Sequence, residues 1–150
     1  ELRQARYLVR SHVLMLATED VTRISWYDFY NDGTKPTYNE HNFGLIHNNA
    51  YNCAPKPAFV AYREMTEQLT GRDFVRMRKP GGGLYLATFS GKEKEVVVAW
   101  SIKGSRTVEV DGVKTARNLM GNKLDASSEI TVDEYPVYLK GASPKVTPAN

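Results

Sequence analysis

The sequence predicts an α+β protein in which a helical part precedes a small antiparallel β-sandwich. Before Gly71, two segments repeat apolar residues at the spacing of an amphipathic helix. After Gly71, short runs of β-branched and aromatic residues alternate with glycine-containing turns. We therefore expect a helical part at 1–72, an antiparallel β-sandwich at 73–142, and a frayed tail at 143–150 that contains two prolines.

Two helices are predicted in the first part, over 3–17 and 57–70. The apolar face of the first consists of Ala5, Leu8, Val9, Val13 and Leu16. Pro57 suits the first turn of the second helix, and Gly71 suits its end. The apolar face of this second helix consists of Ala58, Ala61, Tyr62, Met65 and Leu69. We expect the two helices to pack side by side.

A buried strand is predicted over 21–30, between the two helices. The run is rich in β-branched and aromatic residues and places apolar side chains on both faces. Asn31-Asp32-Gly33 and Pro36 then end the strand. The polar segment that leads to Pro57 lacks periodicity, and loops of that length in a compact domain are often functional.

The second part contains six candidate strands. They span 84–89, 95–102, 107–110, 113–119, 130–132 and 137–139. Asp111-Gly112 lies between two of them and is the strongest hairpin signal in the chain. Six short strands of this kind are typical of a small antiparallel sandwich.

Composition narrows the range of functions. The 150 residues suffice for one domain of ordinary size or for two small modules. The net charge is +3 and the basic residues are scattered, which does not favour nucleic acid as a partner. Because the chain has no long apolar run, we also expect no membrane insertion. The single cysteine, Cys53, allows neither an intrachain disulfide nor a thiolate cluster, and His12, His41 and His47 fit no compact ligand motif, so we expect no metal or other cofactor.

Five short motifs, in this order, carry a resemblance to a known family. They are residues 4–10 (QARYLVR), 26–28 (WYD), 40–45 (EHNFGL), 56–58 (KPA) and 136–139 (PVYL). The chain resembles the C-terminal portion of retaining glycoside hydrolases in which a (β/α)8 barrel is followed by a β-sandwich. The resemblance implies that 3–17, 21–30 and 57–70 are the seventh helix, eighth strand and eighth helix of the barrel.

The resemblance also implies where the chemistry lies. Such enzymes use two carboxylates across the glycosidic bond, and both positions would precede residue 1. Glu1 does not follow a strand, as a barrel nucleophile must. We expect no catalytic residue in this chain and no activity of the chain alone. The resemblance favours a secreted or periplasmic location, and the expected partners are a polysaccharide or oligosaccharide and either the missing barrel half or a second copy.

Trp26 and Trp100 are the aromatic candidates for sugar contact. In the resembling enzymes, the tryptophan at the position of Trp26 forms the floor of the sugar subsite beside the cleaved bond. An aromatic face covers the apolar side of a pyranose, although either tryptophan also fits a buried core position. For Trp100, which ends the run Val96-Val97-Val98-Ala99, the core interpretation is favoured.

Asp28, Glu40, His41 and Asn42 are the polar candidates. Asp28 can accept hydrogen bonds from sugar hydroxyls or cap the turn that follows it. Glu40, His41 and Asn42 would border the active-site face of a complete barrel, whereas solvated loop residues are the simpler interpretation.

Three functions remain open on the sequence. The first is a non-catalytic, carbohydrate-related fragment that binds polysaccharide through aromatic residues. The second is part of an active retaining glycosidase whose catalytic glutamates lie upstream. The third is a purely structural accessory module.

Overall fold

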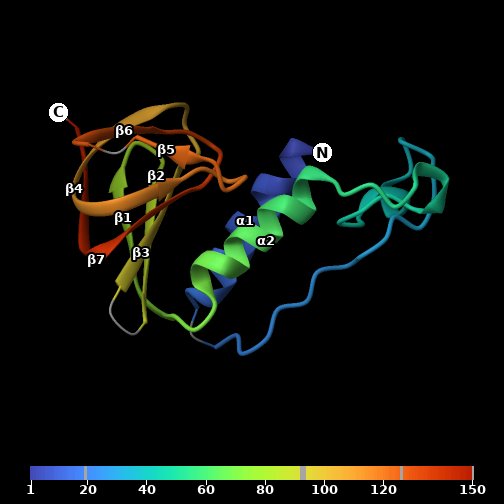
Figure 1. Ribbon diagram of the computed structural model, residues 1–150, viewed down its shortest axis with the longest axis horizontal. Helices are drawn as coiled ribbons and strands as arrows, with labels where there is room; N and C mark the ends of the chain where they lie inside the picture. Colours follow the sequence, from blue (N-terminus) through green and yellow to red (C-terminus); the bar gives the residue numbers. More distant parts are fainter. Residues whose placement is uncertain (19, 92–93, 126, 150) are drawn as a thin grey trace.

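The two helices confirm the sequence prediction and run parallel to each other. The computed structural model describes residues 1–18, 20–91, 94–125 and 127–149. In it, α1 spans Leu2–Leu16 and α2 spans Pro57–Leu69, each within one residue of its predicted bounds. Both helices begin beside the loop that joins them (Figure 1). Further along, the ring centroids of His12 and Tyr62 lie 5.5 Å apart.

The prediction of a strand at 21–30 is wrong. This segment runs back along the helix pair as extended chain (Figure 1), and its only ladder contact in the described residues is an isolated bridge from Tyr30 to Ile46. A strand needs a neighbour to take its backbone hydrogen bonds, and the described strands all pair elsewhere. The segment instead bonds to its own loop, through Leu45 N to Asp28 O at 2.9 Å and Ile46 N to Phe29 O at 3.0 Å.

The loop between Tyr30 and Pro57 is irregular, as predicted. It contains two short 3-10 helices, η1 (Asn39–Asn42) and η2 (Asn49–Tyr51). The turns of η1 and η2 provide hydrogen bonds for part of the loop's backbone N–H and C=O groups. The long loop therefore has a defined shape at the N-terminal end of both helices (Figure 1).

The second part is a seven-stranded antiparallel sheet with the order β1-β2-β3-β7-β4-β5, and β6 also pairs with β4. Its strands are β1 (Asp73–Gly81), β2 (Leu84–Gly91), β3 (Lys94–Ser101), β4 (Arg106–Arg117), β5 (Lys123–Leu124), β6 (Glu129–Val132) and β7 (Val137–Pro148). Strands β1 and β5 were not predicted, because β1 is mostly exposed and rich in basic residues and β5 has two residues.

Two features predicted for this part are wrong, and both concern β4 and β7. Asp111-Gly112 does not turn a hairpin; it lies inside the single strand β4, where the register with β7 shifts. A bulge, like a tight turn, uses a glycine with positive φ, and Gly112 has φ +69°. The tail is not frayed: β7 continues to Pro148 with Val146 fully buried, while residue 150 lies outside the described residues.

The sheet curls over one core and carries the helices on its other face. The inner core consists of twelve buried residues from β2, β3, β4, β6 and β7, and Leu86, Val97 and Val146 are among them. A second core joins α1 and α2 to the outer face of β2, β3 and β7. The predicted sandwich is therefore one continuous, curled sheet rather than two separate ones (Figure 1).

Candidate functional site

The candidate site is a pocket of about 650 Å³ between the first turns of α1 and the loop. Its walls are Glu1, Arg3, Gln4, Tyr7, Pro36, Asn39, Asn42, Phe43 and Lys56. This volume is in the range of small-molecule sites in proteins. The pocket combines two aromatic rings with amide, carboxylate and cationic groups, so that both the apolar and the polar parts of a ligand have partners.

The backbone of Phe43 is the anchor of the pocket. Its carbonyl oxygen accepts hydrogen bonds from Gln4 Nε2 at 2.8 Å and from Trp26 Nε1 at 3.0 Å. One donor comes from α1 and the other from the extended segment, so the loop is tied to both. Phe43 nevertheless remains 40% exposed, and its ring is T-shaped with the Tyr27 ring, with centroids 6.4 Å apart.

Lys56 is a buried cation at the start of α2. Its side chain is 3% exposed overall, and Nζ donates to Asn42 O at 2.7 Å and to Asn31 Oδ1 at 3.2 Å. Burial lowers the pKa of Lys56, and the Glu1 carboxylate opposes that shift. The hydrogen bonds compensate part of the cost of burying the ammonium group, and they hold the loop against the helix.

Tyr7 is the aromatic residue that α1 contributes. It is 44% exposed, and the guanidinium groups of Arg3, Arg6 and Arg10 lie 5.5, 5.2 and 5.7 Å from its ring centroid. Cations at such distances are attracted to the ring face. The Tyr7 ring therefore lies among cationic groups on the pocket wall.

The predicted residue Trp26 lies behind the pocket wall. It is half-buried, packs against the helix core and has its ring centroid 6.1 Å from that of His12. Through its bond to the Phe43 carbonyl it positions the pocket's aromatic wall. Asp28 is also half-buried, and its Oδ1 accepts a hydrogen bond from the backbone N–H of the next residue, Phe29.

Of the three loop candidates, only Asn42 lines the pocket. Its Nδ2 donates to the carbonyls of Lys35 at 2.9 Å and Tyr38 at 2.8 Å, so the side chain braces the loop. The His41 ring accepts from Lys35 N–H at 3.2 Å and packs against Gly33, where a Cβ would overlap it. Glu40 is exposed and accepts from the Tyr38 hydroxyl at 3.3 Å.

Trp100 is not available for ligand contact. It is 1% exposed on β3 and stacks on Tyr85, with ring centroids 5.0 Å apart and an interplanar angle of 11°. The prediction of Trp100 as a sugar-contacting residue is therefore wrong, because the helix pair covers the outer face of the sheet at this point.

Three of the pocket's main residues, Gln4, Tyr7 and Lys56, were not predicted as site residues. Gln4, Tyr7 and Lys56 lie in two of the motifs that carry the family resemblance. The sequence does contain a signal for Tyr7: it is a large aromatic residue that lies off the apolar face of α1, so it is expected to be exposed and available for contact. Their convergence depends on the parallel arrangement of the helices, which the spacing of residues does not specify.

No protein-family model, curated protein sequence or solved structure matches this chain. Among the described residues, no three His, Cys, Asp or Glu side chains gather in a way that could hold a metal ion. The described helices are also too short or too polar to cross a bilayer.

Proposed function

We propose that the chain binds oligosaccharide without catalysis at the pocket between α1 and the loop. The observation that carries this proposal is the pairing of two partly exposed aromatic rings, Tyr7 and Phe43, with the polar side chains of Arg3, Asn39 and Asn42 in one pocket. Sugar rings present apolar C–H faces edged by hydroxyl groups, and a pocket of this composition has partners for both.

The position of the pocket in the fold supports the same proposal. We propose that residues 1–72 correspond to the seventh helix, eighth strand and eighth helix of a (β/α)8 barrel, in keeping with the sequence resemblance, with 21–30 as extended chain at the position of the strand. Two parallel helices joined by an extended segment are the arrangement that neighbouring β/α units have (Figure 1). The pocket lies at the N-terminal ends of these helices, the end at which such barrels place their active sites. In a full barrel the two catalytic carboxylates would come from other strands.

A structural accessory role is the second candidate. It is favoured by the burial of Trp100 and by the use of Asn42 for bonds inside the loop. A module with this role would bind none of the sugars tested, so binding measurements separate the two candidates.

Calorimetric titration with cellohexaose, xylohexaose and mannohexaose tests the proposal. We expect saturable binding of at least one, and we expect Phe43→Ala and Tyr7→Ala each to weaken it about 5-fold, as loss of an aromatic contact worth ~1 kcal/mol implies. Trp26→Ala removes the donor that holds the Phe43 carbonyl and should weaken binding as well.

Tyr51→Ala is the matched control. Tyr51 is 52% exposed on the same loop but does not line the pocket, so its removal should leave affinity unchanged. Far-UV circular dichroism establishes that each variant is folded. Failure to bind any of the three sugars, or equal losses in Tyr51→Ala and Phe43→Ala, contradicts the proposal.

A further inference from the structure

A cationic groove lies at the other end of α2, away from the candidate site. It encloses about 420 Å³ between the last turn of α2 and strands β3, β4 and β7. Its lining comprises Glu67, Gln68, Lys94, Lys114, Thr115, Arg117, Lys140, Gly141 and Ala142. Four of these side chains are basic and one is acidic.

Strand pairing brings the basic residues together. Lys140 on β7 lies opposite Val96 on β3 and opposite Thr115 on β4, so the three occupy one row across adjacent strands. Because side chains alternate between faces, Lys94 shares the face of Val96, and Arg117 shares the face of Thr115. This face carries the helices, as the packing of Val96 against them establishes.

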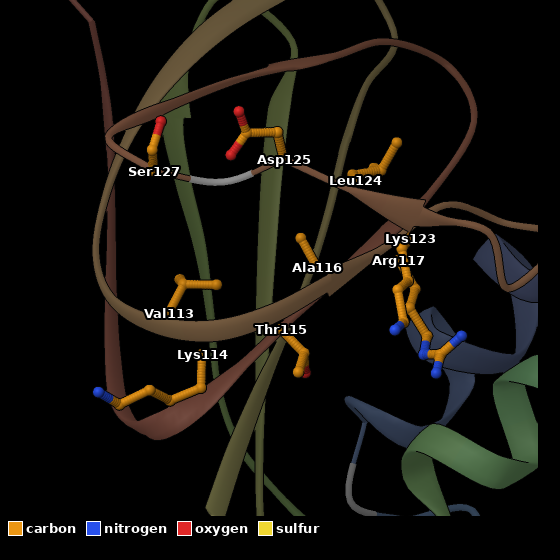
Figure 2. Close-up of a pocket in the computed structure, with 9 residues that line it drawn as sticks. All are labelled: Val113, Lys114, Thr115, Ala116, Arg117, Lys123, Leu124, Asp125 and Ser127. Atoms are coloured by element: carbon orange, nitrogen blue, oxygen red, sulfur yellow. The ribbon is translucent and has the colours of Figure 1, made fainter.

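Figure 2 shows three of these residues, Lys114, Thr115 and Arg117, from the neighbouring hollow, which is bounded by β4 and the segment with Asp125 and Ser127. Thr115 and Arg117 project from β4 away from Asp125, whereas Ala116 projects toward the hollow. Lys114, Thr115 and Arg117 of β4 border both this hollow and the cationic groove, and the Thr115 and Arg117 side chains extend from the side of β4 opposite to Ala116.

The charges in the groove are only partly compensated. Burial, followed by the nearby cations Arg72, Lys94 and Arg117, lowers the pKa of Lys140, while Glu67 opposes the shift. Arg117 is engaged already, since Nη1 donates to Gly121 O at 2.5 Å and Nε lies 4.0 Å from Glu64 Oε1. Within the described parts of the chain, Lys94, Lys114 and Lys140 lie more than 4.0 Å from any carboxylate.

The C-terminus of a helix usually repels an anion, because its exposed carbonyl groups carry partial negative charge. At the end of α2 this repulsion is reduced, because nearby groups are already hydrogen-bonded. The carbonyl of Gln68 accepts a hydrogen bond from Arg72 Nη1 at 2.7 Å, and the Gln68 side chain donates to Glu64 Oε1 at 2.8 Å. The Gln68 carbonyl and the Glu64 carboxylate are thus both bonded within the protein, and Glu67 is the acidic residue among those that line the groove.

We propose that this groove binds a compact ligand carrying a tetrahedral oxyanion, a phosphate or a sulfate, with Lys94, Lys114 and Lys140 as its cationic partners and Thr115 as a hydroxyl donor. The ligand's charge relieves the repulsion among the lysines, and the groove's volume exceeds that of the oxyanion, leaving space for a sugar-sized body. The site is separated from the pocket at Tyr7 and Phe43 by the length of α2, about 20 Å for its 13 residues.

Calorimetry and amide NMR, used to monitor titrations with glucose 6-phosphate, glucose 6-sulfate, inorganic phosphate and glucose, test this site. We expect saturable binding of the charged probes, with shifts at residues 94, 114, 115 and 140, and no binding of glucose. Lys114→Gln with Lys140→Gln should weaken binding at least 10-fold. Higher affinity for the charged sugars than for inorganic phosphate assigns the site to a sugar-borne oxyanion, and equal affinity assigns it to the free ion.

The control is the double variant Lys103→Gln with Lys145→Gln, which removes the same charge from exposed residues outside the groove. Equal weakening in both double variants, or shifts that never saturate, overturns the proposal. The neutral hexasaccharides provide an independent readout, because the lysine variants should bind them as the unmodified chain does.

Discussion

At the scale of single residues, His12 is a buried titratable group whose surroundings favour the neutral form. It is 4% exposed between Trp26 and Tyr62, and Nδ1 lies 2.8 Å from the Leu8 carbonyl, which requires the proton on Nδ1. Nε2 has no hydrogen-bond partner among the described residues. Protonation would therefore place a charge in apolar surroundings, and burial lowers the pKa of His12 below 6.5.

Stability should consequently fall as the pH falls below 6.5. In that window the unfolded chain binds a proton that the folded chain binds less readily, so the free energy of unfolding decreases until the folded-state pKa is passed. Urea midpoints measured at pH 7.5 and about pH 5.5 should differ more for the unmodified chain than for His12→Phe. Equal differences would show that other groups cause the change.

The predictability of the site also depends on single residues. A polar loop and an aromatic run are local signals that single out Asn42 and Trp26; Asn42 lines the pocket, whereas Trp26 lies behind its wall. Gln4 and Lys56 were not singled out, since their role comes from two carbonyls, those of Phe43 and Asn42, far away in the chain. For Trp100, the apolar run that precedes it favoured a core position over sugar contact, and the residue is buried beneath the helix pair.

At the scale of elements, the bulge shared by β4 and β7 determines the shape of the sheet. Gly112 on β4 and Gly141 on β7 approach so closely that a Cβ on Gly141 would lie 2.1 Å from Gly112 O. On either side of this point, β4 pairs with different parts of the sheet: with β6 before it and with β5 after it. A bulge bends the strand that contains it, which here lets the sheet curl over its inner core.

Gly141→Ala should destabilise the protein by about 2 kcal/mol or more, because the backbone of β4 must move to admit the methyl group. Gly104→Ala is the control: its φ is +75° but its Cβ would meet nothing within 4 Å, so only ~1 kcal/mol of conformational cost is expected. Urea denaturation measures both. Similar losses in the two variants would contradict the close approach.

Local pattern was sufficient for the helices but not for this bulge. Apolar spacing, Pro57 and Gly71 placed α1 and α2 within a residue of their ends. Asp111-Gly112 was read as a hairpin because a type I′ turn and a bulge both select a glycine with positive φ. The choice between them depends on β7, whose second half pairs there and was predicted to be a tail.

At the scale of the whole molecule, one core joins the helices to the sheet. Leu8 and Val13 of α1, Met65 of α2 and Phe89 of β2 belong to the same buried cluster, and Arg6 forms an ion pair with Glu134. The sequence predicted a helical part and a β part, but it did not specify that the outer face of the sheet would be the surface on which the helices pack.

We expect the chain to unfold in one cooperative transition. Leu8→Ala should cost about 3 kcal/mol, as removal of a buried leucine side chain does. In a Trp26→Phe background, Trp100 fluorescence reports on the sheet and far-UV circular dichroism reports largely on the helices. Both signals should shift to lower urea by the same amount. Loss of the helical signal before that of Trp100 would instead indicate two independent units.

The pairing of β7 has a mechanical consequence. In the described residues, the strand ladder of 145–148 is with β4, and Arg78 of β1 adds a side-chain bond to the Val146 carbonyl at 2.8 Å, whereas 138–141 are paired with β3 on one side and β4 on the other. Tension applied at Pro148 across the strands would therefore break the hydrogen bonds between β7 and β4 one residue pair at a time, until the break reached Gly141. Beyond that point two ladders must yield together, so resistance to force should rise in a single step within one strand.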